Sequence, residues 1–308
     1  QFWMYAGGLE NHADVIEQVC RIHPLMGISG DRLRSVRSPE SLARQVKFPE
    51  SRFSPPPWAD TGTWLLKPRN SGGGLGIRLA NSEPFSSESH YIQRQIHGTT
   101  GSSLFLGDGH RQALLLSSFH AITVPSDPWR YFGSIGPIAL PAATAQSCTD
   151  VGNTLVRAYG LQGLFGVDWV LDENEQLWVL EINPRWTATA EICHRVNEWP
   201  LVRWHIAACR NGRLPSVRQS ASNRLIAKRI LYTREDIVFE ARMLKEWENA
   251  VSVEFNQWCD IPQSGTTIPS GQPVCTFLLS SERDDLQSLH ALAQAQVDQL
   301  NKISSFLH

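Results

Sequence analysis

The sequence of 308 residues has no apolar run near the ~20 residues that a membrane-spanning helix needs. Its 28 Lys and Arg residues are nearly balanced by 30 Asp and Glu residues, so its charge gives no case for binding nucleic acid or an anionic membrane surface. The six cysteines are scattered and form no CxxC pair, which argues against a zinc site or a disulfide framework. We therefore expect reduced thiols, a cytoplasmic location, and neither a nucleic-acid nor a membrane partner.

Signatures of nucleophilic enzymes and of two common nucleotide folds are also missing. The sequence has no GxSxG and no Cys/His signature of a catalytic nucleophile. Its glycine-rich stretch is not followed by Lys-Ser or Lys-Thr, and a predicted strand rather than a helix comes next, which excludes a Walker A loop and a dinucleotide-binding fingerprint. The composition, 42% apolar and 19% charged, is typical of a globular protein, and the length allows two or three structural units.

The stretch GLFGVDWVLDENEQLWVLEINPR, residues 163–185, organises the rest of the chain. Two β-rich runs flank the polar segment 172–176, which predicts a hairpin. Because side chains alternate along a strand, two sets share a face: Leu164, Gly166, Asp168 and Val170 on the first strand, and Leu177, Val179, Glu181 and Asn183 on the second. If Leu171 pairs with Trp178 and Val170 with Val179, Asp168 lies opposite Glu181.

Directly opposed carboxylates lie with their Cβ atoms about 4.5–5.5 Å apart and repel each other. An apolar-flanked pair with an amide beside it needs a shared proton or a cation. All-oxygen ligands of this kind suit Mg²⁺ or Mn²⁺ better than zinc. The alternative is the solvated polar face of an ordinary hairpin.

The stretch TWLLKPRNSGGGLGIRLA, residues 63–80, predicts a strand ending in Lys67-Pro68, a glycine-rich loop, and a second strand from Ile77. Glycines let backbone N–H groups turn inward, so such a loop can fold over phosphates. Lys67 would add a positive charge. A flexible hairpin without a ligand is the alternative.

The remaining pattern predicts helices and strands in mixed order. Expected strands are 2–6, 24–28, 90–96, 102–108, 112–124, 223–232 and two within 251–279; expected helices are 11–21, 40–46, 142–159, 187–196, 199–209 and one from 281 with an apolar stripe of Leu286, Leu289, Val297, Leu300 and Ile303. Residues 125–139 are expected to be a loop that either covers a site or is a surface excursion.

The order of these motifs resembles the ATP-grasp superfamily over about residues 1–235. KPRNSGGGLGI and FGVDWVL…LWVLEINPR carry the resemblance together. It implies an α+β or α/β ATP-grasp fold, with two α+β lobes around an antiparallel sheet, and a truncated N-terminal α/β domain. We expect sequence upstream of Gln1 to be missing. The expected division is 1–36 for the remainder of that domain, 37–124 for the small lobe, 125–235 for the large lobe, and 236–308 for a β-rich segment and terminal helix.

The resemblance also implies roles for individual residues. Arg37 and Lys67 would face the ATP phosphates, and Ser71, Gly72, Gly73, Gly74 and Gly76 would form the loop over the γ-phosphate. Gln93, Arg94, Gln95 and Ile96 would form the adenine clamp, with Gln93 where many members have Glu. Asp168, at a position that is commonly Glu, would bind Mg²⁺ or Mn²⁺ with Glu181 and Asn183. Arg185 would stabilise the transferring phosphoryl group and the acyl phosphate.

The family resemblance implies an ATP-dependent ligase that activates a carboxylic acid as an acyl phosphate and couples it to an amine, as in glutamate-type ligation. A narrower resemblance, in GGLENH and CDIPQSGTTIPSGQPVCTF, is to the branch linked to methanofuran and tetrahydromethanopterin biosynthesis. ATP-dependent phosphoryl transfer, carboxylase-type bicarbonate activation, and non-catalytic nucleotide binding stay open. The expected partners are a small-molecule acid and amine, with a homodimer left open. An aromatic or acidic substrate is one interpretation of the following residues, and packing or surface charge is the alternative for each of them: Trp129, Arg130, Tyr131, Trp186, His194 and Arg195.

Overall fold

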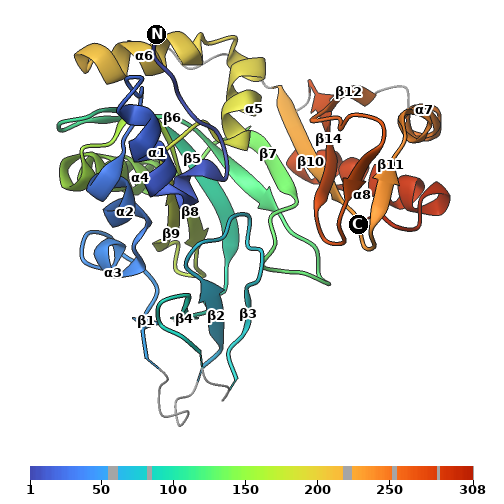
Figure 1. The fold of residues 1–308 in the computed structure, drawn as a ribbon, viewed down its shortest axis with the longest axis horizontal. Coiled ribbons are helices and arrows are strands. Elements are labelled where there is room, and N and C mark those ends of the chain that lie inside the picture. The colour runs from blue at the N-terminus through green and yellow to red at the C-terminus, as the bar shows by residue number, and fades with distance from the viewer. Residues whose placement is uncertain (55–61, 82–84, 218–223, 252–254, 283–284, 308) are drawn as a thin grey trace.

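The strands form an eight-stranded, a four-stranded and a two-stranded antiparallel sheet in the computed structural model (Figure 1). The structure describes residues 1–54, 62–81, 85–217, 224–251, 255–282 and 285–307. The four-stranded sheet, at the bottom of Figure 1, has the order β1-β4-β2-β3. Its strands are β1 (Ser51–Arg52), β2 (Trp64–Pro68), β3 (Arg78–Leu79) and β4 (His90–Arg94).

The eight-stranded sheet is the centre of the molecule. Its order is β12-β14-β10-β7-β6-β5-β8-β9. The bounds are β5 (Thr99–Asp108), β6 (Ala113–Ile122), β7 (Gly133–Ile138), β8 (Gln162–Leu171), β9 (Leu177–Asn183), β10 (Leu225–Tyr232), β12 (Phe255–Cys259) and β14 (Pro273–Ser281). β10 bonds to β7 on one side and β14 on the other, so the C-terminal strands extend the same sheet.

Helices cover both faces of this sheet. α4 (Ala142–Tyr159) packs against one face, where its Leu155 joins Phe105 and Phe165 in one buried cluster. α5 (Ala188–Asn197) and α6 (Leu201–Asn211) pack against the other face, where they meet Leu104 and Leu164. Neighbouring residues of β5 and β8 therefore point into different cores, as strand alternation requires. α8 (Leu286–Ile303) packs on β10 and β14 near the C-terminus.

The N-terminal segment contains one parallel strand contact. Trp3 forms an isolated parallel bridge with Leu25, where two strands were expected. The 3₁₀-helix η1 (Leu9–Asn11) and the helices α1 (Ala13–Cys20), α2 (Gly30–Arg37) and α3 (Pro39–Leu42) follow. These helices pack on the same side of the sheet as α4. Ser38 caps α3 by accepting a hydrogen bond from Ser41 N, with Pro39 first in the helix.

The predicted antiparallel central sheet is confirmed, but some predicted elements are wrong. The predicted loop 125–139 contains β7, whose GSIGPI sequence lacks apolar alternation. Residues 251–279 hold three strands rather than two, because β13 (Thr266–Ile268) pairs with β11 (Ile237–Phe239). α2 and α7 (Ala241–Ala250) have no predicted counterpart.

Two predictions at the ends of elements also differ from the structure. Ile303, which was predicted to lie in the buried stripe of α8, is 48% exposed at the end of that helix. The predicted strand 223–232 begins at Leu225, and Asn223 lies outside the described residues.

Candidate active site

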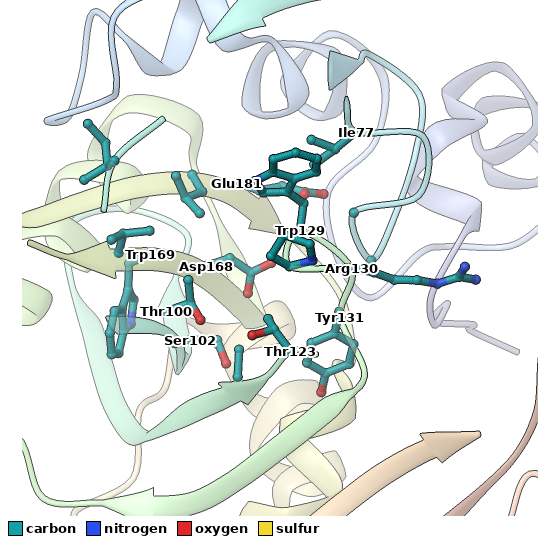
Figure 2. Close-up of a pocket in the computed structure, with 18 of the residues that line it drawn as sticks. Ile77, Thr100, Ser102, Thr123, Trp129, Arg130, Tyr131, Asp168, Trp169 and Glu181 are labelled. Carbon is teal, nitrogen blue, oxygen red and sulfur yellow. The ribbon is translucent and has the colours of Figure 1, made fainter. Parts of the chain in front are cut away.

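Asp168 on β8 and Glu181 on β9 are direct partners in the hairpin, as predicted. Figure 2 shows their side chains projecting from neighbouring strands into a shared space. Asn183 donates a 2.9 Å hydrogen bond from Nδ2 to Oδ2 of Asp168. The three side chains line one cavity of about 470 Å³. They place carboxylate and amide groups together at the end of the hairpin.

The hairpin reaches this pairing by a route that the sequence did not predict. Near its loop, Leu171 pairs with Leu177 and Val170 with Trp178, one residue away from the predicted partners. A register shift between Asp168 and its neighbour then makes Leu180 the extra residue of a β-bulge. The bulge restores the opposition of the two carboxylates.

The bulge also changes which side chains of β9 share a face. Leu177 and Val179 lie in the buried core beside α4. Leu180, Glu181 and Asn183 line the cavity. The predicted single face containing Leu177 and Val179 together with Glu181 and Asn183 is therefore wrong, because an inserted residue reverses the alternation.

The two carboxylates have different electrostatic surroundings. Burial and the facing charge of Glu181 raise the pKa of Asp168 to about 7. Burial also acts to raise the pKa of Glu181, but the charge and hydrogen bond of Arg37 outweigh it and lower that pKa below its usual value. Asp168 therefore holds or releases a proton near neutral pH, whereas Glu181 is ionised.

This donor set fits Mg²⁺ or Mn²⁺. Two half-buried carboxylates and an amide oxygen are hard oxygen ligands, and a cation would relieve the repulsion that raises the pKa of Asp168. Within the described ranges, no group of three or more His, Cys, Asp or Glu side chains is arranged to hold a metal ion. The carboxylate pair supplies two such side chains, and Asn183 adds an amide beside them.

Lys67 lines the same cavity from β2 of the small sheet. Its Nζ donates a 2.9 Å hydrogen bond to Oε1 of Gln93 on β4. Gln93 is almost fully buried, and its Nε2 bonds to Oγ of Ser51 at 3.3 Å. The side-chain amide of Gln93 is therefore engaged at both ends, while Arg94, Gln95 and Ile96 line the cavity beyond it.

Arg37 reaches the site from the end of α2. One guanidinium nitrogen donates to Glu181 and, at 3.1 Å, to the carbonyl of Ile182. The other donates to Oδ1 of Asn11 at 3.1 Å and to the carbonyl of Ser71 at 3.2 Å. The contact with Ser71 connects Arg37 to the start of the glycine-rich loop.

Arg185 lies beside the metal-site residues at the end of β9. Nε donates to Oε1 of Glu10 at 2.7 Å, one terminal nitrogen to the carbonyl of Trp186 at 3.2 Å, and the other to Oδ1 of Asn183 at 3.2 Å. A guanidinium has five N–H groups, so three are engaged and two remain. Arg185 lines the cavity, and the remaining pair can meet a planar anion there.

The glycine-rich loop packs onto the segment before β7. The carbonyl of Gly73 accepts a 2.9 Å hydrogen bond from Tyr131 N. Gly74 has φ +75°, and a Cβ there would lie 1.9 Å from the carbonyl oxygen of Trp129. Gly73 and Gly74 line the main cavity, and Ser71 lines a smaller adjoining pocket with Arg37. The predicted residues Gly72 and Gly76 line neither.

The expected substrate contacts divide into two groups. Trp129, Arg130 and Tyr131 all line the cavity, but the guanidinium of Arg130 extends away from it and donates a hydrogen bond to the carbonyl of Gly271 (Figure 2). His194 bonds to the carbonyl of Trp199. Three expectations are wrong at this cavity, because the side chains belong to helix packing or a surface ion pair: Trp186, His194 and Arg195.

Sequence reasoning missed several polar side chains that border the cavity. Thr100 and Ser102 of β5 and Thr123 after β6 lie near Asp168 (Figure 2). Alternation along β5 could have indicated Ser102, which pairs directly with Asp168. The contacts of Glu10 with Arg185 and of Asn11 with Arg37 were missed as well. A local sequence pattern does not predict contacts between residues so far apart in the chain.

Comparison with known proteins identifies the domain that holds these residues. Residues 33–189, half of the chain, match the profile of the ATP-grasp domain. No match was found among curated protein sequences. Among the described residues, no helix has the length and apolar character needed to cross a bilayer.

Several solved structures share the fold at low sequence identity. N5-carboxyaminoimidazole synthase from Aspergillus clavatus, with ADP and 5-aminoimidazole ribonucleotide, has a TM-score of 0.68 at 14% identity, over 94% of this chain and 79% of that chain. L-amino acid ligase from Bacillus licheniformis has a TM-score of 0.64 at 14% identity, over 94% and 76%. The biotin carboxylase domain dimer of 2-oxoglutarate carboxylase from Hydrogenobacter thermophilus, with MgADP, ADP and bicarbonate, has a TM-score of 0.61 at 14% identity, over 98% and 73%.

Proposed function

The chain belongs to the ATP-grasp family, and from that premise we propose that it is an ATP-dependent ligase joining a carboxylic acid to an amine. One observation carries the proposal. Asp168 and Glu181 face each other beside Asn183, and cationic side chains from separate segments, Arg37, Lys67 and Arg185, surround the pair. A protein that only binds a nucleotide has no need of this convergence.

ATP is proposed to lie between the small sheet and the large sheet. Residues 94–96 line the cavity, and their backbone would meet the adenine edge. Lys67, Gly73 and Gly74 line the same cavity as the carboxylate pair, and they would meet the triphosphate. Mg²⁺ held by Asp168, Glu181 and Asn183 would neutralise charge on the phosphate oxygens.

The side chains of the site suit the formation of an acyl phosphate. A carboxylate oxygen of the acid attacks the γ-phosphorus, and the bond to the bridging oxygen of ADP breaks. The two remaining N–H groups of Arg185 match the oxygens of the acid or of the transferring phosphoryl group. The amine nitrogen then attacks the acyl carbon, phosphate leaves with the electrons of the C–O bond, and the nitrogen loses a proton.

The similar structures favour this reaction class without identifying the substrates. An L-amino acid ligase, an N5-carboxyaminoimidazole synthase with bound ADP, and a biotin carboxylase domain with bound MgADP and bicarbonate share the fold. We propose small-molecule acid and amine substrates. Cytoplasmic location and a homodimer remain predictions, although one similar domain is a dimer.

ADP release tests the proposal directly. The protein is incubated with Mg²⁺ and ATP and a panel of acids, including glutamate, each with and without a panel of amines. Release that requires both an acid and an amine is expected. Release driven by bicarbonate without an amine would favour the carboxylase-type reaction, and nucleotide binding with no release in any combination would contradict the ligase.

A further inference from the structure

The turn Gly7–Asn11 lies outside residues 33–189, yet it contacts the candidate active site. Gly8 has φ +93°, which favours glycine, and η1 then presents two consecutive polar side chains. The sequence predicted a helix that begins at Asn11 and runs to residue 21. The structure instead caps the helix at His12 without a side-chain bond, and the side chains of Glu10 and Asn11 each contact an arginine of the site.

Glu10 holds the innermost edge of Arg185. It is 4% exposed, and its Oε1 accepts the 2.7 Å hydrogen bond from Nε. The carbonyl of Trp186 and Oδ1 of Asn183 fix the two outer nitrogens. Contacts on all three nitrogens fix the plane of the guanidinium, and the remaining N–H groups keep one direction. A Cβ on Gly7 would lie 3.6 Å from Cζ of Arg185, so the turn itself lies against the group.

Asn11 holds the second arginine. Its Oδ1 accepts a 3.1 Å hydrogen bond from Arg37, whose other contacts are Glu181 and the carbonyls of Ile182 and Ser71. Arg37 lies on the side of the glycine-rich loop, whereas Arg185 lies beside Asn183. One short turn therefore reaches two cations with different positions in the site.

The burial of Glu10 should lower the stability of the fold, so packing alone does not explain it. Its Oε2 is buried and has no hydrogen-bond partner among the described residues. A buried carboxylate oxygen without a partner lowers stability, and such groups in native proteins need an explanation. The negative charge of Glu10 also acts on Arg37, whose pKa burial lowers but whose acidic neighbours, Glu181 first, raise above its usual value. Glu10 is thus a counter-charge shared by both guanidinium groups.

We propose that Gly7–Asn11 is a positioning element in which Glu10 orients Arg185 for the acid substrate and Asn11 orients Arg37 for the ATP phosphates. The kinetic part rests on the proposed ligase function, whereas the contact between Glu10 and Arg185 is independent of it. If the two arginines are oriented before the substrates bind, they need not reorganise during the reaction. The turn would increase the rate by holding them in that orientation.

The kinetic test compares neighbours on the same turn. Glu10→Gln keeps an acceptor and removes the charge, and Glu10→Leu removes both. We expect kcat with the cognate pair to fall about 10- to 100-fold, more for Leu than for Gln, with a raised KM for the acid and little change in MgATP affinity. Asn11→Ala should instead weaken MgATP binding. Glu17→Gln, which removes an exposed ion pair with Arg34 in the same segment, is the control and should change neither quantity.

A second measurement needs no substrate. In ¹⁵N–¹H spectra, the Arg185 Nε–H signal is assigned by its loss in Arg185→Lys, and its solvent exchange should be slow in the wild type and fast in Glu10→Leu. Unchanged exchange in Glu10→Leu, or Glu10 variants that match Glu17→Gln in kcat and KM, would overturn the positioning role. Absence of ADP release by the wild type with every acid–amine pair would overturn the ligase function, and the exchange experiment would still decide whether Glu10 holds Arg185.

Discussion

Lys67 donates a 2.9 Å hydrogen bond to Gln93, so the cation expected at the phosphates is tied to the strand expected at the adenine. The two residues lie on neighbouring strands of the small sheet, where Leu65 is the direct partner of Gln93. Lys67 therefore has a fixed starting position at the cavity wall. Because its partner Gln93 is a neutral amide, its positive charge remains uncompensated by that contact.

Lys67→Ala should weaken MgATP binding about 10- to 100-fold, since a hydrogen bond to a charged group contributes about 1.5–3 kcal/mol. Isothermal titration calorimetry of the folded variant measures this change. Lys47→Ala is a matched control, because Lys47 stacks on Trp178 and bonds to Gln176, away from the cavity. Equal affinity of the Lys67 variant and the wild type would remove Lys67 from the nucleotide site.

Asp168→Asn and Glu181→Gln should both reduce ADP release by about 100-fold or more, because each removes a charged metal ligand. Their effects on the metal-free fold should differ in sign. Asp168→Asn removes a facing like charge and should stabilise by about 0.2–1 kcal/mol. Glu181→Gln breaks the ion pair with Arg37 and should destabilise by roughly 1–3 kcal/mol, less than a fully buried pair because Glu181 is 33% exposed.

Urea denaturation without metal separates these two stability effects, and ADP release with a cognate pair measures the loss of turnover. Near-normal release by Glu181→Gln would show that the metal assignment is wrong. Stabilisation by both variants would mean that the ion pair between Arg37 and Glu181 does not stabilise the metal-free fold.

Gly74→Ala should displace the glycine-rich loop. The added Cβ would lie 1.9 Å from the Trp129 carbonyl oxygen, a rigid backbone atom, and φ +75° strains any L side chain. We expect weaker MgATP binding and lower turnover, measured by calorimetry and ADP release. Gly72→Ala is the control, because no heavy atom lies within 4 Å of its added Cβ. Identical behaviour of the two variants would contradict the packing of the loop on Trp129.

Asp108 should make folding sensitive to acid. Burial alone would raise its pKa, but its Oδ1 accepts backbone hydrogen bonds from His110, Arg111 and Gln112, and these lower the pKa below its usual value. A lowered folded pKa stabilises the protein above the unfolded value, and this contribution is lost as the pH falls through the folded one. Asp108→Asn keeps an acceptor without the charge, so its unfolding free energy should fall less steeply between about pH 5 and pH 2. Parallel curves would exclude the charge as the cause.

The sequence predicted the hairpin and the opposition of its two carboxylates, but not the register that produces it. Asp168 and Glu181 are 13 residues apart in one hairpin, and they face each other because a bulge corrects a pairing that is one residue away from the predicted one. The bulge at Leu180 was not predictable, since apolar residues occupy both faces of β9 and any register buries some of them. β7 was missed for a related reason: its glycines and Pro137 read as loop, yet pairing with β6 and β10 makes the segment a strand.

Contacts between distant segments could not be predicted from one sequence. Glu10 and Arg185 are separated by 175 positions, and nothing near Glu10 distinguishes it from a surface carboxylate. Arg195 shows the opposite error: it lies close to the site in sequence, but one helical turn pairs it with Glu191. Tertiary packing decides both cases, whereas the family resemblance supplied Arg37 and Lys67.

Arg185→Lys should retain MgATP binding but lose most turnover, about 100-fold, because a positive charge remains while the planar fork is lost. Lysine has no rigid pair of N–H groups to replace those that Arg185 leaves unengaged beside Glu10, Trp186 and Asn183. Calorimetry and ADP release measure the two effects, and Arg195→Lys, in an ion pair on α5, is the control.

The underlying acyl phosphate can be tested in the wild type with an acid labelled with ¹⁸O in its carboxylate. Attack of that oxygen on the γ-phosphorus transfers label to inorganic phosphate once the amine is added. Label found only in the organic product would contradict the acyl phosphate, and Arg185 would then have no carboxylate–phosphoryl pair to align.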